Sequence, residues 1–541
     1  MRIALAQINS YLGAFEDNCK KIINASHRAK DRRCDVVVFP EAALFGYHPM
    51  DLLERDSIIA EQLKYLKIIK QQIPKDILVI FGAFTRNSSK NGKPYFNSAV
   101  AIQKGKKIFL AHKELLPTYD VFDDARHIEP GKIKNNIIQF RGKKILITIC
   151  EDIWAWPHSI QHRKSNYSHN PIQSLRPKSV DLVVNLSASP AYVGKLKKRK
   201  AVVMKTAKWL RAPVIYVNMV GAQDELIFDG ASFAVSAQGK TLTQAAQFQE
   251  DLCIFDSARS EGERRPILDK DIELIHQGLV LGLRDFVFKT GQRRVHLGLS
   301  GGIDSAVVAC LAVDALGADN VKALALPGPY SSPQSLALAK KLAKNLGIEL
   351  LVLDIKKHYK DVYSAIKKIM GPPKSSLVSE NLQSRLRGIL LMAMSNQLGS
   401  LLLNTSNKTE LACGYGTIYG DMIGALSPIG DLLKKDVVQL ANYYNSHQEL
   451  IPKLTITREP TAELKKNQKD SDSLPRYSVL DASVERVIEK MSPPRNSVDQ
   501  FLLKALNQSE FKRWQAPPIL KIKEHSFGRG RRIPIAHKAL K

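Results

Sequence analysis

The sequence predicts an α/β protein in two parts, the second of which contains a doubly wound parallel sheet. Residues 294–355 alternate strand-like and helix-like segments, and residues 1–256 alternate shorter strands with helices. The chain of 541 residues is also too long for one ordinary domain. Alternation of this kind is typical of parallel strands that are joined by crossover helices.

The boundary between the two parts is predicted from composition. The stretch SARSEGERRPILDKD, residues 257–271, is polar, charged and contains one proline, which is typical of a linker. We therefore predict an N-terminal domain over residues 1–256 and a C-terminal domain over residues 272–541.

Apolar strands of the N-terminal part end on functional side chains. CDVVVFPE ends at Glu41, KKIFLAHK at Lys113 and KKILITIC at Cys150, while DLVVNLSAS ends in hydroxyls at Ser187 and Ser189. Side chains at the same ends of neighbouring strands meet at one rim of a sheet. An acid, an ammonium group and a thiol are therefore expected to converge.

The C-terminal part begins with a predicted helix over residues 271–291, which ends at a glycine. Ser332 followed by Pro333 is a typical helix start, and Gly347 is a typical helix end. The strands and helices that follow the first helix are predicted at RVHLGLS (294–300), SAVVACLAVDALG (305–317), VKALALP (321–327), SPQSLALAKKLAKNLG (332–347) and IELLVLDI (348–355).

Composition limits the classes of partner. The net charge of +28 favours anionic partners, but the basic residues are scattered, which favours nucleotides over nucleic acid. No apolar run is long enough to span a membrane, and the N-terminus does not resemble a secretory signal. The six cysteines include no CxxC pair, which favours a reducing cytoplasm.

The string LGLSGGIDSAVVACLAV, residues 297–313, places two glycines between a strand and a helix. Glycines let the backbone approach a phosphate, and the helix N-terminus offers unpaired N–H groups. The loop lacks the lysine of a Walker A loop. A glycine pair alone also fits a tight turn without a ligand, so the longer string SGGIDS carries the phosphate-site prediction.

SGGIDS resembles the pyrophosphate loop of the N-type ATP pyrophosphatases, whose fold is adenine nucleotide alpha hydrolase-like. These enzymes are implied to split ATP into AMP and pyrophosphate with Mg²⁺. Three further strings resemble NAD synthetases, at LLNTSNKTELACGYGTIYGDMIGALSPIGDLLKKDVVQLA (402–441), PTAELKKNQKDSDSLPRY (460–477) and QAPPILKIKEHSFGRGRRIPIA (515–536).

The resemblance implies roles for individual residues. Asp304 and Glu410 would hold Mg²⁺, and Asn381, Glu410 and Lys521 would contact deamido-NAD. Arg385 and Arg387 fit either phosphate contacts or an exposed helix face. The residues implied to bind ATP are Gly298, Leu299, Ser300, Gly301, Gly302, Ile303, Asp304, Ser305 and Thr405.

Glu41, Lys113 and Cys150 match the triad of the nitrilase, or carbon–nitrogen hydrolase, superfamily. The strings FPEAALFGY, HKELLPTYDVFDDAR and CEDIW resemble its glutamine-hydrolysing branch, which is fused to NAD synthetase. The resemblance implies an α-β-β-α sandwich for the N-terminal part. It also implies that Tyr119, Ser189 and Lys195 bind glutamine. A lone Cys150 would equally fit a buried structural thiol.

Two features depart from the family pattern. The family has a supporting glutamate where this chain has Asp124, which is one methylene shorter, so its reach to Lys113 is an open question. The stretch from Trp156 to Lys178 is longer and more polar than the usual connection, and the sequence assigns it no role.

The resemblances together imply ATP-dependent amidation of deamido-NAD to NAD, the final step of NAD biosynthesis. Glutamine would supply the ammonia, and the other products would be glutamate, AMP and pyrophosphate. One alternative is a tRNA-modifying or other ATP pyrophosphatase amidotransferase, and another is a non-catalytic nucleotide-binding protein. The partners expected are small molecules, with no nucleic acid and no membrane. A homo-oligomer is also implied, because the family's synthetase domains pair.

Overall fold

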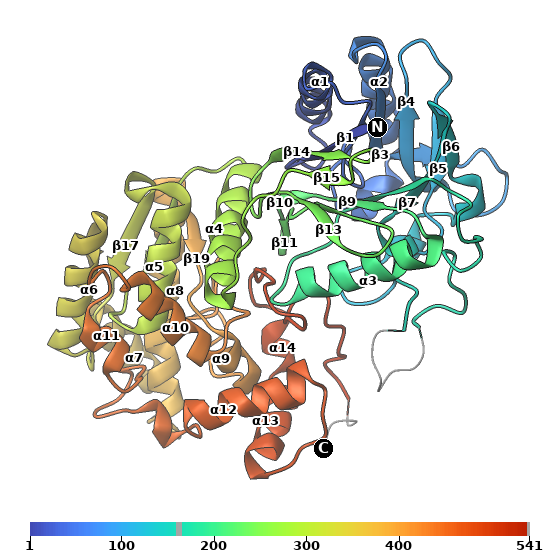
Figure 1. Ribbon diagram of the computed structural model, residues 1–541. Helices are drawn as coiled ribbons and strands as arrows, with labels where there is room; N and C mark the ends of the chain where they lie inside the picture. The colour runs from blue at the N-terminus through green and yellow to red at the C-terminus, as the bar shows by residue number, and fades with distance from the viewer. Residues whose placement is uncertain (158–164, 538–541) are drawn as a thin grey trace. The chain divides into compact units, whose positions relative to one another are not determined.

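The computed structural model describes residues 1–157 and 165–537 of the chain, which forms two compact units, Met1–Asp271 and Ile272–Lys541 (Figure 1). Within these described ranges, no helix combines the length and the apolar character that crossing a membrane requires.

A seven-stranded sheet forms one layer of the first unit. Strands β1, β2 and β3 are parallel, and the flanking strands pair antiparallel. Helices α1 (Phe15–Asp31) and α2 (Asp56–Gln72) pack on one face through apolar side chains such as Ile22 and Ile69. The strand order is β15 (Glu261–Gly262), β14 (Asp251–Asp256), β1 (Arg2–Gln7), β2 (Val36–Val38), β3 (Leu78–Arg86), β4 (Tyr95–Ile102) and β5 (Phe109–His112).

A six-stranded sheet forms the second layer of this unit. Helix α3 (Lys195–Leu210) covers its outer face, and β10 (Val220–Gln223) and β11 (Leu226–Asp229) form a separate hairpin. The strand order is β13 (Thr241–Gln244), β12 (Phe233–Val235), β9 (Val214–Asn218), β8 (Leu182–Ser187), β7 (Lys143–Ile149) and β6 (Ile137–Phe140).

The two sheets share one buried core. Ile3 and Val38 of the first sheet pack in the same cluster as Ile147 and Val184 of the second sheet. The helices therefore lie outside and the sheets inside, which confirms the predicted α-β-β-α sandwich. Part of the predicted linker, Glu261–Gly262, is the edge strand β15, because its backbone pairs with β14.

The second unit is built on a four-stranded, wholly parallel sheet, which confirms the predicted doubly wound fold. Its order is β18 (Glu349–Val352), β17 (Val321–Ala325), β16 (Val295–Gly298) and β19 (Leu401–Leu403). The first helices of the unit are α4 (Asp271–Lys289), α5 (Ile303–Leu316), α6 (Pro333–Leu346), α7 (Lys356–Met370) and α8 (Ser376–Leu398).

Helix α6 begins and ends where Ser332 and Gly347 predicted. The Ser332 hydroxyl caps α6 by accepting the N–H of Ser335, and Gly347 ends α6 in a left-handed conformation. Helix α5 begins at Ile303, two residues before the predicted start at Ser305. Asp304 therefore lies in the first helical turn, directly behind the glycine pair.

A second helical cluster completes this unit. Its core contains Leu411, Leu433, Val484 and Leu502. The helices are α9 (Lys408–Cys413), α10 (Lys434–Tyr444), α11 (Lys453–Thr457), α12 (Tyr477–Val484), α13 (Ser497–Gln508) and α14 (Glu510–Arg513). The short helical turns of the described chain are η1 (Met50–Glu54), η2 (Asp124–Arg126), η3 (Ile133–Asn135), η4 (Cys150–Ile153), η5 (Ala318–Asn320), η6 (Asp470–Asp472) and the π-turn η7 (Glu485–Glu489).

Candidate active sites

The first unit buries Glu41, Lys113 and Cys150 together. Glu41 follows β2, Lys113 follows β5 and Cys150 follows β7. The Lys113 Nζ atom lies 2.8 Å from Glu41 Oε1, and the charges of both side chains act on the Cys150 thiol. The structure therefore brings an acid, an ammonium group and a thiol into one site.

The Glu41 carboxylate is held on both oxygens. Asn97 Nδ2 donates to Oε1 at 2.7 Å, and the backbone N–H of Ala188 donates to Oε2 at 2.9 Å. Gly82 of β3 permits the close approach, since a Cβ there would lie 2.0 Å from the Ala42 nitrogen. The carboxylate is therefore fixed before a substrate binds.

Asp124 reaches Lys113 in spite of its shorter side chain. Its Oδ2 atom lies 2.7 Å from Lys113 Nζ, and both side chains are buried. The turn η2 brings the backbone close, because the Asp124 N–H donates to the carbonyl of Pro117. Burial alone would lower the pKa of Lys113, but the carboxylates of Asp124 and Glu41 raise it well above its usual range. Lys113 therefore remains a cation.

Cys150 lies at a sharp turn between β7 and η4, with a φ angle of 43°. The buried Asp152 carboxylate fixes this turn. It accepts the N–H of Ile149 on one oxygen and those of Glu114 and Leu115 on the other. Burial, then the Glu41 charge, raise the pKa of the Cys150 thiol well above its usual range, and Lys113 opposes them. The resting thiol is therefore protonated, with its base beside it.

Two of the three predicted glutamine-binding residues lie around Glu151, which the sequence analysis missed. The Tyr119 hydroxyl donates to Glu151 Oε1 at 2.9 Å. Lys195 Nζ lies 4.3 Å from the centre of the Trp154 ring, and the Glu151 charge acts on it. Burial, then the Arg199 charge, lower the pKa of Lys195 to about 8. The position of Glu151 directly after the nucleophile was the available signal.

Ser189 belongs to a buried network next to this site. Its hydroxyl oxygen accepts a hydrogen bond from Arg199 Nε at 3.1 Å, and Arg199 pairs with Asp229 at 2.6 Å. The Ser189 N–H donates to Asn218. Ser189 is therefore fixed at the end of β8 by partners on α3 and β9, and Asp229 of β11 holds the arginine on α3.

In the second unit, the SGGIDS loop closes on itself. The hydroxyls of Ser300 and Ser305 lie 3.2 Å apart, and the Gly302 N–H donates to Ser300 Oγ. Gly301 has a φ of 80°, and a Cβ there would lie 2.3 Å from the Ser335 carbonyl oxygen. Only glycine fits this position without a shift of α6.

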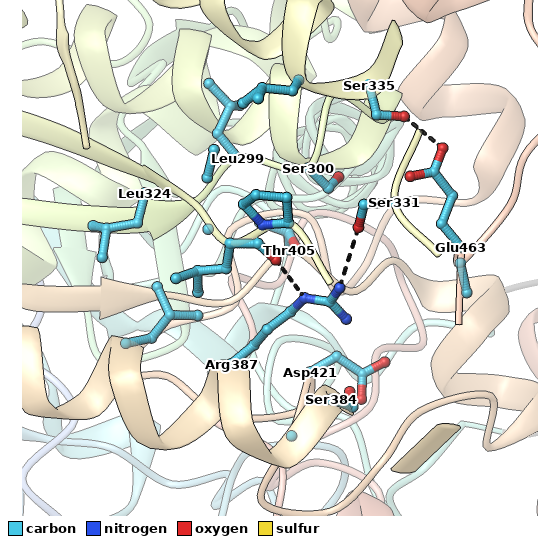
Figure 2. Close-up of a pocket in the computed structure, with 18 of the residues that line it drawn as sticks. Leu299, Ser300, Leu324, Ser331, Ser335, Ser384, Arg387, Thr405, Asp421 and Glu463 are labelled. Carbon is cyan, nitrogen blue, oxygen red and sulfur yellow. Dashed lines mark hydrogen bonds between the residues drawn. The ribbon is translucent and has the colours of Figure 1, made fainter. Parts of the chain in front are cut away.

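A cavity of about 220 Å³ adjoins the loop (Figure 2). Leucines such as Leu324 and Leu391 line one part of it, while Ser300 and Thr405 supply polar groups. Arg387 also lines the cavity and donates to the Leu326 carbonyl at 2.9 Å, whereas Arg385 is exposed. The mixture of apolar walls and convergent polar groups suits a nucleoside with phosphates.

Asp304 and Glu410 meet across the loop. Lys434 Nζ lies 2.6 Å from Asp304 and 3.7 Å from Glu410, and Asn407 Nδ2 donates to Asp304 at 2.9 Å. Burial, then the Asp304 charge, raise the pKa of Glu410 to about 8. Carboxyl oxygens are the ligands that a hard divalent cation such as Mg²⁺ prefers, and the charge of a bound ion would favour the ionised form of Glu410.

Lys434 is a second residue that the sequence analysis missed. It lines a cavity of about 490 Å³ together with Ile303, Arg458 and Tyr477, and Arg458 also lines the smaller cavity. Both cations come from segments more than a hundred residues after the loop, so spacing alone did not link them to it. They supply the positive charge that the loop lacks.

Asn381 and Lys521 lie away from the walls of these two cavities in the described chain. Asn381 accepts a hydrogen bond from Thr417 at 2.8 Å. Lys521 is buried and donates to the Glu524 carbonyl. The buried Asp431 accepts the N–H groups of Ile522 and Lys523, which fixes the segment that carries Lys521.

Comparisons with known proteins fit this division. A family described as NAD synthase matches residues 275–516, and one described as carbon-nitrogen hydrolase matches residues 2–265. The glutamine-dependent NAD(+) synthetase of Synechocystis sp. is 42% identical over 556 residues, which cover 99% of this chain and 98% of the relative. This chain belongs to the glutamine-dependent NAD(+) synthetase family.

Other members agree with this assignment. The relative from Thermotoga maritima is 35% identical over 99% of both chains. The structure of the Acinetobacter baumannii glutamine-dependent NAD+ synthetase in complex with ADP has a TM-score of 0.77 and 34% identity, and the match covers 99% of this chain and 98% of that one. A Cytophaga hutchinsonii synthetase with 19% identity and a TM-score of 0.82 supports the fold. The alternative of a tRNA-modifying enzyme is not retained.

Proposed function

We propose that this chain makes NAD from deamido-NAD, ATP and L-glutamine, with glutaminase chemistry in the predicted domain 1–256 and synthetase chemistry in the predicted domain 272–541. The observation that carries the proposal is the buried Glu41–Lys113 pair around Cys150 in a chain of this family. The ADP complex of the Acinetobacter baumannii relative supports the use of ATP.

In the glutaminase step, Glu41 takes the Cys150 proton as the thiolate attacks the glutamine amide carbon. Lys113, held as a cation by Asp124 and Glu41, stabilises the oxyanion that forms. Collapse of this intermediate breaks the C–N bond, and Glu41 returns the proton to the departing ammonia. Water then hydrolyses the glutamyl thioester to glutamate.

Glutamine, the substrate of this step, is held by its α-carboxylate and α-ammonium groups. Lys195 is the cation suited to the α-carboxylate, and Glu151 is the anion suited to the α-ammonium group. Tyr119 orients Glu151, and Ser189 completes the wall at the end of β8. The side-chain amide of glutamine then extends toward Cys150.

In the synthetase step, the nicotinate carboxylate of deamido-NAD attacks the α-phosphorus of ATP and pyrophosphate leaves. Residues Gly298–Ser305 and Thr405 hold the ATP, and Lys434 and Arg458 offset the charge of the pyrophosphate. Ammonia then attacks the adenylated carboxyl carbon and displaces AMP. We assign contacts with deamido-NAD to Asn381, Glu410 and Lys521.

Asp304 and Glu410 would hold Mg²⁺, which would neutralise phosphate charge when bound. The charge of a bound ion would favour the ionised form of Glu410, whose pKa burial and the Asp304 charge raise to about 8. Lys434 already contacts both carboxylates, so it positions them for the ion.

We also propose that the chain is a homo-oligomer in a reducing cytoplasm. All six cysteines are free in the structure. Helix α7 has no buried residue, and its Ile369 and Met370 are 83% and 81% exposed. On α8, which packs against α7, Leu377 is 59% and Ile389 is 64% exposed. Apolar groups at this exposure are typical of an interface between subunits.

Cys150→Ala tests the division of labour. The variant should form NAD from ammonia at the wild-type rate and lose at least about a thousandfold of its glutamine-dependent rate, because only the glutaminase nucleophile is removed. NAD, AMP and pyrophosphate are measured with each nitrogen source. Cys253→Ala, which alters a buried thiol of the same unit, serves as the control.

Loss of both activities in a folded Cys150→Ala protein would contradict the two-site proposal. Retention of glutamine-dependent synthesis would contradict the role of Cys150.

A further inference from the structure

Tyr167 lies in the polar stretch between Trp156 and Lys178, to which the sequence assigned no role. Its hydroxyl donates to Glu151 Oε1 at 2.8 Å, and the Tyr119 hydroxyl donates to the same oxygen at 2.9 Å. Two phenols from separate segments therefore hold one oxygen of a carboxylate that directly follows the nucleophile Cys150.

The other oxygen of Glu151 has a different environment. Among the described residues, Oε2 has no hydrogen-bond partner, although the side chain as a whole is buried. Donors that share Oε1 fix the plane of the carboxylate, so Oε2 faces a constant direction. This oxygen is not one of the fully enclosed polar atoms of the described chain that lack a partner, so a ligand can reach it and supply a donor.

The charges around Glu151 come from several elements. Lys113 after β5 and Lys195 on α3 attract its negative charge, while the Cys150 thiol is next to it in sequence. Burial raises the pKa of Glu151, and the hydrogen bonds from Tyr167 and Tyr119 lower it. Removal of either phenol hydroxyl should therefore favour the protonated, uncharged form.

We propose that Tyr167 is a positioning residue for glutamine recognition, which orients Glu151 so that its free oxygen accepts the α-ammonium group of the substrate. This inference rests on the proposed glutaminase function. It gives the unassigned stretch a role, because one hydroxyl from it completes the amino-acid end of the site. It also makes the α-ammonium group a requirement, since an amide without one leaves Glu151 Oε2 unpaired.

Tyr167→Phe in the full-length protein tests the proposal, because it removes one hydroxyl and keeps the ring. We expect the KM for glutamine to rise about 5- to 20-fold, as fits a lost hydrogen bond to a charged group, with a smaller change in kcat. NAD synthesis from ammonia should stay at the wild-type rate. The acidic limb of kcat/KM for glutamine should shift to higher pH, because Glu151 loses a donor that favours its ionised form.

Tyr95→Phe is the matched control. The Tyr95 hydroxyl also donates to a carboxylate, that of Asp56, at 2.9 Å, but this pair lies outside the Cys150 site. The control should keep the wild-type KM and pH profile. A second comparison uses glutaramic acid, which is glutamine without its α-amino group. Wild type should prefer glutamine over it strongly, and Tyr167→Phe should prefer glutamine less.

An unchanged KM and an unchanged acidic limb in Tyr167→Phe would overturn the inference. So would an equal loss of glutamine-dependent and ammonia-dependent synthesis, which would indicate a structural effect. If wild type itself fails to use glutamine but uses ammonia, the proposed glutaminase function fails and this inference fails with it.

Discussion

Single residues of the glutaminase site differ in how firmly they hold their charge. Lys113 contacts two carboxylates and stays a cation, whereas Lys195 is half-buried near Arg199 and has a pKa of about 8. In the proposed mechanism both lysines act as cations, Lys113 toward the oxyanion and Lys195 toward the α-carboxylate of glutamine. Glutamine recognition should therefore fail in mildly alkaline solution, where catalysis itself is still possible.

Lys195→Arg tests this pH dependence. Deprotonation of Lys195 removes the cation, so the wild-type KM for glutamine should rise as the pH passes about 8. An arginine keeps its proton to above about pH 12, so the variant should hold its KM to higher pH. The KM is measured between about pH 7 and about pH 9.5, a range that contains the pKa of Lys195. If the KM for glutamine rises at the same pH in wild type and in Lys195→Arg, the role of Lys195 is contradicted.

The convergence of side chains was predictable where a functional group ends a strand. The positions of Glu41, Lys113 and Cys150 followed from apolar runs, because strand ends share one rim of a sheet. Tyr167 and Lys434 could not be found in this way. Each reaches its site from a loop or helix start whose path depends on tertiary packing. Tyr167 has no local pattern, and Lys434 lies within the string 402–441, which assigned it no role.

At the scale of elements, the turn from β16 into α5 shapes the phosphate loop. The helix starts earlier than its sequence predicts, because Gly302 adopts the extended N-cap conformation and leaves Ile303 as the first helical residue. This places Asp304 beside Glu410 and Lys434. The two additional residues at the start of α5 therefore include the carboxylate that joins the site.

Gly301→Ala tests the loop geometry. Its Cβ would meet the Ser335 carbonyl at 2.3 Å, so either the loop or α6 must shift. We expect NAD synthesis from ammonia to fall at least about a hundredfold, since a small misplacement of reacting groups has an effect of this size. Glutamine hydrolysis, which belongs to the other unit, should remain measurable.

Gly317→Ala is the control at the opposite end of α5. Gly317 has the same φ of 80°, but a Cβ there meets no atom within 4 Å. The φ angle is therefore matched and the collision is absent. Equal losses of synthesis in the two variants would show that strain, and not the contact with Ser335, explains the effect.

Periodicity predicted the strands and helices of residues 271–355, because β16 and β17 are mostly buried and most residues of α5 are buried. It failed for β15, a two-residue edge strand within the predicted linker. Such a strand forms through backbone pairing with β14, and polar side chains such as Glu261 give no apolar signal.

At the scale of the whole molecule, α7 and α8 stand out from the other long helices. Most helices bury an apolar stripe within their own unit, but α7 buries no residue and α8 buries only Gln383, Ser384 and Gly388. Sequence periodicity predicts which side of a helix is apolar. It does not tell whether the chain itself or a second copy covers that side, so the structure was needed to find this surface.

The double variant Ile369→Glu with Met370→Glu tests whether a second copy covers it. Two buried apolar side chains contribute roughly 3–6 kcal/mol at an interface, so the charged pair should weaken self-association at least about tenfold. Sedimentation over a range of protein concentrations measures this association. Phe288→Glu on α4 is the control, since Phe288 is a half-exposed apolar residue outside α7 and α8.

A wild-type protein that sediments as a monomer at all concentrations would contradict the homo-oligomer. If the double variant instead associates like wild type, the oligomer must use another surface, because two carboxylates could not be buried at α7 without partners.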